Sequence, residues 1–165
     1  MKAGNIMSHI IVIYPNNYIC LCDYKDYHSI NEAIDGCFEC CGVFGALDSM
    51  CITYCNEEFL FREDLNFNGL ASILCGQPIY GNLVIMKDER NSYGERDSFP
   101  FDLIQATGIC MVLEKIKEKF MPIIKELHSQ YDNKRPEPKA HVTITPQEEN
   151  NLESINDYTG EVEAN

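Results

Sequence analysis

The chain has 165 residues, of which 45% are hydrophobic, and this length and composition predict one globular domain with or without a tail. The net charge of −13 argues against a protein that binds nucleic-acid phosphates or anionic membranes. Nine irregularly spaced cysteines are a poor disulfide framework, and we find neither a signal peptide nor an apolar run of the roughly 20 residues that span a bilayer. We therefore expect a cytoplasmic protein with reduced thiols.

The start of the chain predicts a hairpin followed by a short helix. Residues 9–14 and 18–22 are apolar, largely β-branched runs, and a Pro-Asn-Asn turn separates them. Ser29 and Glu32 form a capping box, in which each side chain can bond a backbone amide of the first turn. We expect a helix over residues 29–37 that packs on the sheet.

Three cysteines follow this helix, at Cys37, Cys40 and Cys41. A CxxC pair with a third cysteine has the spacing of half a zinc site, but the other half is not evident in the sequence. We favour cysteines that serve packing, and we predict no bound metal and no cofactor.

The middle of the chain predicts two strands and a short helix. Residues 43–47 and 50–55 are apolar runs separated by two residues, which suits a hairpin turn, although the first run could instead be an irregular lead-in. Asn66 or Asn68 can cap a helix over residues 70–74, and Gly76 can close it. The last strand is expected at residues 81–86, followed by a polar connection at 87–98.

A long helix is predicted from Phe101 to about His128, where apolar residues follow 3-4 spacing. Pro122 lies inside this pattern and should kink the helix. Docking on the sheet is the favoured use of the apolar stripe, and a dimer seam is the alternative. Because the stripe is long for a small sheet, we expect residues 103–113 to pack on it. The rest should meet a second copy or a partner, through Phe120, Ile124 and Leu127.

These elements predict an α+β fold: a small, mainly antiparallel sheet with a short capped helix and a long C-terminal helix. The domain should cover residues 1–131. Residues 132–165 are expected to be a linker and a disordered tail, because residues 147–165 hold six acids, no base and few apolar side chains.

Residues 9–86 resemble an uncharacterised domain of phage, plasmid and conjugative-element proteins, catalogued as domain of unknown function 3846. The matching features are the opening hairpin, the capped helix, the strand that ends in Asn56-Glu57-Glu58, the segment 68–72 and the stretch from Gly76 to Gly81. The many cysteines depart from this family. The resemblance implies an accessory protein of a mobile element that acts in a bacterial cytoplasm, and it supplies no catalytic residues.

The sequence favours a non-catalytic counter-defence binder. Such a protein would sequester a small nucleotide-like signal, as a sponge, or act as an inhibitor of a host defence protein. Amides, an acid and an aromatic ring could rim its pocket, at Asn56, Glu57, Asn68, Gln77 and Tyr80. One alternative is an acidic mimic of DNA that inhibits a nuclease or restriction enzyme. The other is a hydrolase, which is supported only by the acidic pair Glu57 and Glu58 and four dispersed histidines, so we assign no catalytic residues.

Overall fold

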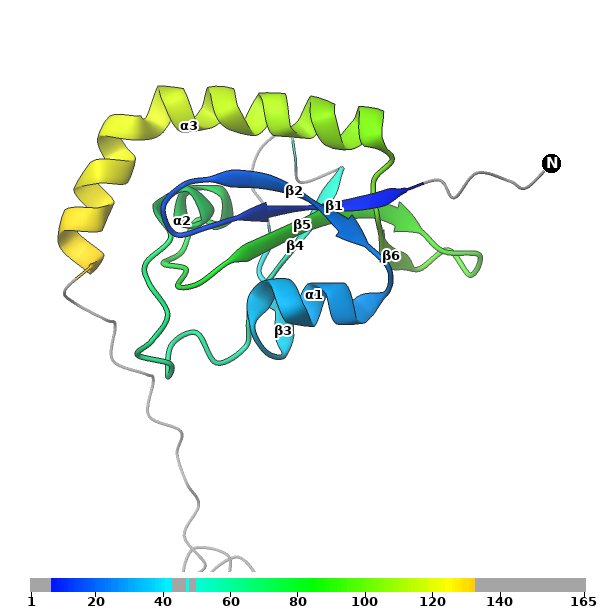
Figure 1. The fold of residues 1–165 in the computed structure, drawn as a ribbon, viewed down its shortest axis with the longest axis horizontal. Coiled ribbons are helices and arrows are strands. Elements are labelled where there is room, and N and C mark those ends of the chain that lie inside the picture. The colour runs from blue at the N-terminus through cyan, green and yellow to red at the C-terminus, as the bar shows by residue number, and fades with distance from the viewer. Residues whose placement is uncertain (1–6, 43–46, 48–49, 133–165) are drawn as a thin grey trace, which may run out of the picture.

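The computed structural model describes residues 7–42, 47 and 50–132 (Figure 1). Six strands form one sheet: β1 (Ser8–Ile13), β2 (Ile19–Tyr24), β3 (Phe38–Cys40), β4 (Cys51–Asn56), β5 (Leu83–Arg90) and β6 (Arg96–Phe99). Its order is β2-β1-β5-β4-β3, with β6 also paired to β5, and these pairings are antiparallel. Three helices complete the fold: α1 (Tyr27–Ile34), α2 (Gly69–Cys75) and α3 (Leu103–Tyr131). The α+β prediction is confirmed.

The sheet is covered on both faces, which makes three layers. Ile10 and Val12 belong to the core beneath α1, whereas Ile11 and Ile13 belong to the core shared with α2 and α3. Figure 1 shows α1 and α3 on opposite sides of the sheet. Residues Leu83 to Met86 of β5 are consecutive and all buried, because the central strand has a covered face on either side.

Helix α1 begins earlier than predicted. Its N-cap is Asp26, whose side chain accepts from the His28 amide at 2.9 Å, and Ser29 occupies the third helical position of the capping box. The helix ends at Asp35, which has a left-handed backbone with φ of 62°. The predicted cap at Ser29 is therefore wrong by one turn, because an Asp at the preceding turn competes for the same role.

Two strands were missed by the sequence prediction. The expected polar connection at residues 87–98 is instead a hairpin: β5 continues to Arg90 and pairs with β6. Gly94, with φ of +79°, closes the turn between them. The side chain of Arg96 bonds Asp88 across the hairpin. β3 is the second omission, a three-residue edge strand within the cysteine-rich segment.

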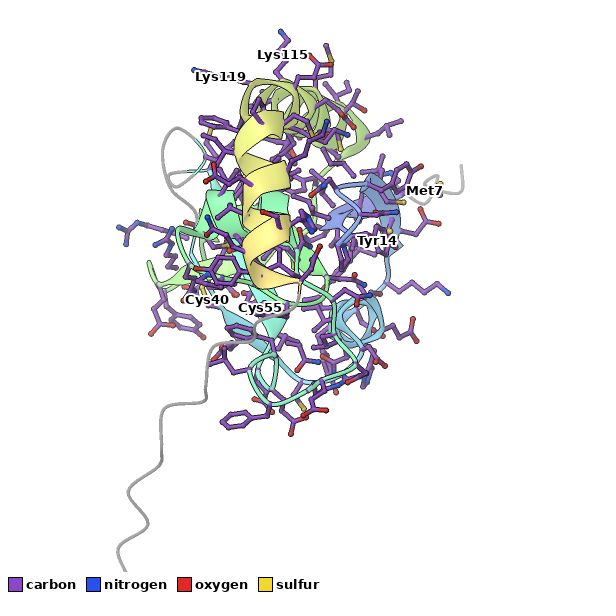
Figure 2. The ribbon with its side chains drawn as sticks, turned by 90° about the vertical axis from the view of Figure 1, so that its left-hand side faces the viewer. Met7, Tyr14, Cys40, Cys55, Lys115 and Lys119 are labelled. Carbon is purple, nitrogen blue, oxygen red and sulfur yellow. The ribbon has the colours of Figure 1, made fainter. Side chains whose placement is uncertain are left out.

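Helix α3 crosses the sheet and then bends down past its edge (Figure 1). Pro122 lies inside α3 and has no amide hydrogen, so one bond of the helical ladder is missing there. Lys115 and Lys119 project from the outer side of the helix, away from the sheet (Figure 2). Within the described ranges, neither α3 nor another helix has the length and apolarity required to cross a membrane.

The predicted tail at residues 132–165 and the apolar run at 43–47 lie outside the described residues, apart from Leu47 and Asp132.

Candidate functional site

The five residues predicted to rim a ligand pocket fall into two groups. Glu57 and Gln77 are exposed, whereas Asn56, Asn68 and Tyr80 are buried in the domain. The structure therefore does not bring the five together as one open rim.

Asn56 uses its side chain to hold the end of α1. Its amide nitrogen donates to the carbonyl of Asp35 at 3.1 Å and lies 3.4 Å from that of Ile34, and its oxygen accepts from the Glu58 amide at 2.8 Å. Gly36 lies against it so closely that an added Cβ would stand 2.9 Å from the Asn56 nitrogen. The Asn56 amide is thus occupied by backbone partners.

Asn68 does the same for α2. Its side-chain oxygen caps the helix by accepting from the Ala71 amide at 3.1 Å. Its nitrogen donates to the carbonyls of Ile13 at 3.0 Å and Gly81 at 2.9 Å, which joins the ends of β1 and β5. Asn68 is 0% exposed, so this amide holds the fold together and has no open side toward a ligand.

One of the predicted rim residues, Tyr80, lines a polar cavity. This polar cavity has a volume of about 390 Å³ and lies between the β1–β2 turn and the end of α3. Its lining is formed by Pro15, Asn16, Glu63, Leu65, Asn66, Phe67, Tyr80, His128 and Asp132.

Aromatic rings form one wall of the polar cavity. The Phe67 ring stacks on Tyr131 with centroids 5.0 Å apart, and it meets the edges of Tyr80 and His128. The Nδ1 atom of His128 is 3.0 Å from a carboxylate oxygen of Asp132, whereas its Nε2 atom is buried with no hydrogen-bond partner. The cavity therefore has aromatic side chains and a His–Asp pair in its lining.

The residues predicted to meet a partner lie elsewhere than expected. Ile124 is fully buried in the core of its own domain, so it is not available to a partner, and Phe120 and Leu127 are half-buried against the same core. The interface prediction is wrong for Ile124. Helix α2 lies under this half of α3 and covers its stripe, which the sequence pattern did not indicate.

An exposed apolar surface lies at the other end of α3. Ile104 is 86% exposed, Leu103 and Met111 are more than half exposed, and Val112 is 42% exposed. Residues 104, 108 and 112 follow one another at helical spacing, so they form a second stripe beside the buried one of Ala106, Ile109 and Leu113.

This second stripe borders a groove of about 460 Å³, called here the α3 groove. It is lined by Met50, Lys87, Asp88, Glu89, Phe101, Ile104, Gln105, Gly108, Ile109 and Val112. A Cβ added at Gly108 would meet nothing within 4 Å, so this glycine leaves the groove open beside it. The groove is thus apolar along the helix and charged along β5.

The charges on the β5 side are paired with one another. Lys87 lies 3.1 Å from Glu89, and Asp88 accepts from Arg96 of β6. Because each of these charged side chains already has an oppositely charged partner, we expect another molecule to bind the groove mainly through the apolar side chains of α3.

Comparison of the chain with known protein families, curated proteins and solved structures finds no match in any of the three. The resemblance to the domain of unknown function 3846 therefore stays a prediction. Among residues 7–42, 47 and 50–132, no group of three or more His, Cys, Asp or Glu side chains is arranged to hold a metal ion. Any functional assignment thus rests on the chain's own geometry.

Proposed function

We propose that this chain is a non-catalytic binding protein that inhibits a partner protein by holding an apolar segment of it in the α3 groove. The observation that carries the proposal is the exposed stripe of Ile104 and Val112 beside an open groove. A contiguous exposed apolar surface marks an interaction site on a folded domain, because leaving it in water is unfavourable. Burying one such side chain completely contributes about 1.5 to 3 kcal/mol.

The charge of the chain favours a basic partner over a second copy. Two copies of net charge −13 repel each other, whereas Lys and Arg beside an apolar segment would be attracted. We therefore propose an apolar segment flanked by basic residues as the occupant. The resemblance to mobile-element proteins supports a host defence protein of a bacterium as its source.

Peptide selection tests this proposal. A library of displayed random peptides is selected on the wild-type protein and counter-selected on Gly108→Phe, whose side chain would fill the groove without meeting an existing neighbour at Cβ. We expect enriched peptides with apolar positions at helical spacing and flanking basic residues. Ile104→Asp should weaken their binding by about tenfold or more, which corresponds to about 1.4 kcal/mol.

Ile123→Asp is the matched control, since Ile123 is also an exposed isoleucine of α3 but does not line the groove. It should leave peptide binding unchanged. Peptides that bind Gly108→Phe as well as wild type would refute the groove as the binding site. Self-association of wild type that Ile104→Asp abolishes would show that a second copy is the occupant.

A small polar ligand in the polar cavity is the second candidate. It is favoured by the polar groups of Asn66 and His128 in the lining of this cavity. A ligand there would be bound through these polar groups, because the Phe67 and Tyr80 rings are only 3% and 2% exposed. Heating the purified protein and analysing the released molecules by mass spectrometry tests this candidate, and a release of no small molecule from protein made in the natural host background would count against it.

A further inference from the structure

Three cysteines and a threonine gather between the sheet and the end of α2. The sulfur of Cys41 lies 3.8 Å from that of Cys75 and 3.4 Å from the hydroxyl of Thr53. Cys55 is also within hydrogen-bonding reach of Cys41. Cys55 and Cys75 are buried, whereas Cys41 is half-buried, so Cys41 is the member that a small solute can approach. None of these residues belongs to the α3 groove or to the polar cavity.

The elements that carry these residues are close because of the sheet register. Cys41 follows β3, and its amide donates to the carbonyl of Thr53 at 3.0 Å, which places it beside Thr53 on the neighbouring strand. Thr53 in turn donates its hydroxyl proton to the carbonyl of Gly42 at 2.8 Å. Cys75 is the last residue of α2 and enters the same space from the helix layer.

The surroundings favour a negative charge on Cys41. Hydrogen bonds from the thiols of Cys55 and Cys75 lower the pKa of the Cys41 thiol, and burial opposes this only in part. The same contacts raise the pKa of Cys55 and of Cys75, because each thiol must keep its proton to donate it. These contacts therefore favour a thiolate at Cys41 over one at Cys55 or Cys75, and a thiolate is the reactive form of cysteine.

We propose that Cys41 is an oxidation site for hydroperoxides and that Cys75 resolves it as a disulfide. The Cys41 thiolate attacks one oxygen of the peroxide, and the O–O bond breaks. Cys41 becomes a sulfenic acid, and the leaving oxygen takes a proton and departs as water or an alcohol. Cys75 then attacks the Cys41 sulfur, the S–O bond breaks, and the oxygen leaves with the Cys75 proton as water. In sum, two thiols are oxidised to a disulfide and one peroxide is reduced.

The register selects Cys75 rather than Cys55 as the resolving partner. Cys41 lies beside Thr53, so Cys55 is its diagonal neighbour across the two strands. Diagonal neighbours have Cα atoms about 7 to 8 Å apart, beyond the usual disulfide range of roughly 4.4 to 6.8 Å. Cys75 sits at a helix end, just before the left-handed cap of Gly76, where a small shift can close the remaining sulfur–sulfur gap.

Hydrogen peroxide titration of the full chain, followed by tryptic mapping, tests the proposal. Cys41 lies in the tryptic peptide 26–62 and Cys75 in the peptide 63–87, so their disulfide joins two separate peptides. We expect this cross-link in wild type and its loss in Cys41→Ser. Cys40→Ser is the matched control, because Cys40 is adjacent in sequence but pairs with Tyr54 and follows Phe38 onto the α1 face of the sheet.

A second measurement does not depend on any variant folding. In wild type at pH 7, Cys41 should react with iodoacetamide about tenfold faster than Cys110, whose pKa burial raises. Equal rates would refute the reactive thiolate. A cross-link that survives in Cys41→Ser, or one confined to peptide 26–62, would overturn the pairing with Cys75. A thiophilic metal ion retained by the purified protein and shielding all three cysteines would overturn the proposal as well.

Discussion

The two halves of α3 carry apolar residues at the same spacing and use them differently. In the second half, Ile124 is fully buried and Phe120 packs against the core, because α2 lies beneath them. In the first half, Leu113 is buried but Ile104, one stripe away, is 86% exposed beside the α3 groove. The comparison teaches that helical periodicity reports how much apolar surface exists, whereas neighbouring elements decide which part of it is covered.

The largest expected effect separates the two halves directly. Ile124→Ala should lower the free energy of unfolding by about 2 to 4 kcal/mol, because it leaves a cavity in a fully packed site. Ile104→Ala should change it by less than about 0.5 kcal/mol, since the side chain is largely in water already. Urea denaturation of both variants measures the difference, and equal losses would mean that the halves do not differ in packing.

A second prediction removes the support of α2, the element that covers the second half. Asn68→Ala should cost about 2 to 3 kcal/mol, because it deletes the helix cap and leaves the carbonyls of Ile13 and Gly81 without their side-chain donor. Gln77→Ala is the control, as an exposed residue from the same predicted rim. An unchanged denaturation midpoint in Asn68→Ala would mean that these bonds contribute little to the free energy of unfolding.

The third prediction concerns the closest approach between α2 and α3. A Cβ at Gly69 would stand 2.9 Å from Ile124 Cγ2 and from the ring of His128, which is shorter than carbon atoms tolerate. Gly69→Ala should therefore destabilise the protein by about 1 to 3 kcal/mol as the two helices separate. Thermal unfolding followed by circular dichroism measures this, and a variant as stable as wild type would show that the side chains move aside freely.

The smallest expected effect has the opposite sign. Gly108→Ala, in the first half of α3, should stabilise the protein by about 0.5 to 1 kcal/mol, because alanine loses less backbone entropy in a helix and its Cβ meets nothing within 4 Å. Together with Gly69→Ala, the same substitution would thus report tight packing at one end of α3 and open space at the other. A destabilised Gly108→Ala would show that the groove is not open.

Local signals were enough to predict several elements. Gly76 ends α2 as predicted, and Asn68, one of the two predicted caps, begins it, because a cap depends only on residues within one turn. The opening hairpin was predictable from its β-branched runs. The β5–β6 hairpin was missed because Lys87 to Arg90 are charged and their strand conformation comes from pairing with Arg96 to Phe99, a tertiary contact.

The sites were less predictable than the fold. The sequence does not distinguish a buried asparagine that bonds backbone groups from an exposed asparagine that binds a ligand. For this reason Asn56 and Asn68 were assigned to a pocket rim. The α3 groove left a signal that was not used: Ile104 and Val112 lie one position outside the main stripe, with Gly108 between them. The approach of Cys41 to Cys75 had no signal, since it depends on how α2 sits on the sheet.

The position of β5 in the middle of the sheet has a consequence for synthesis on the ribosome. β1 pairs with β5 through Ile13 and Leu83, so the β5-facing backbone groups of β1 stay unpaired until about seventy further residues have been synthesised. At the usual 5 to 20 residues per second, the wait is about 4 to 14 s. During that time the β1–β2 hairpin presents unpaired backbone groups that can join another nascent chain. We therefore expect the yield of correctly folded protein to depend on translation speed and on chaperones more than on the stability of the finished domain.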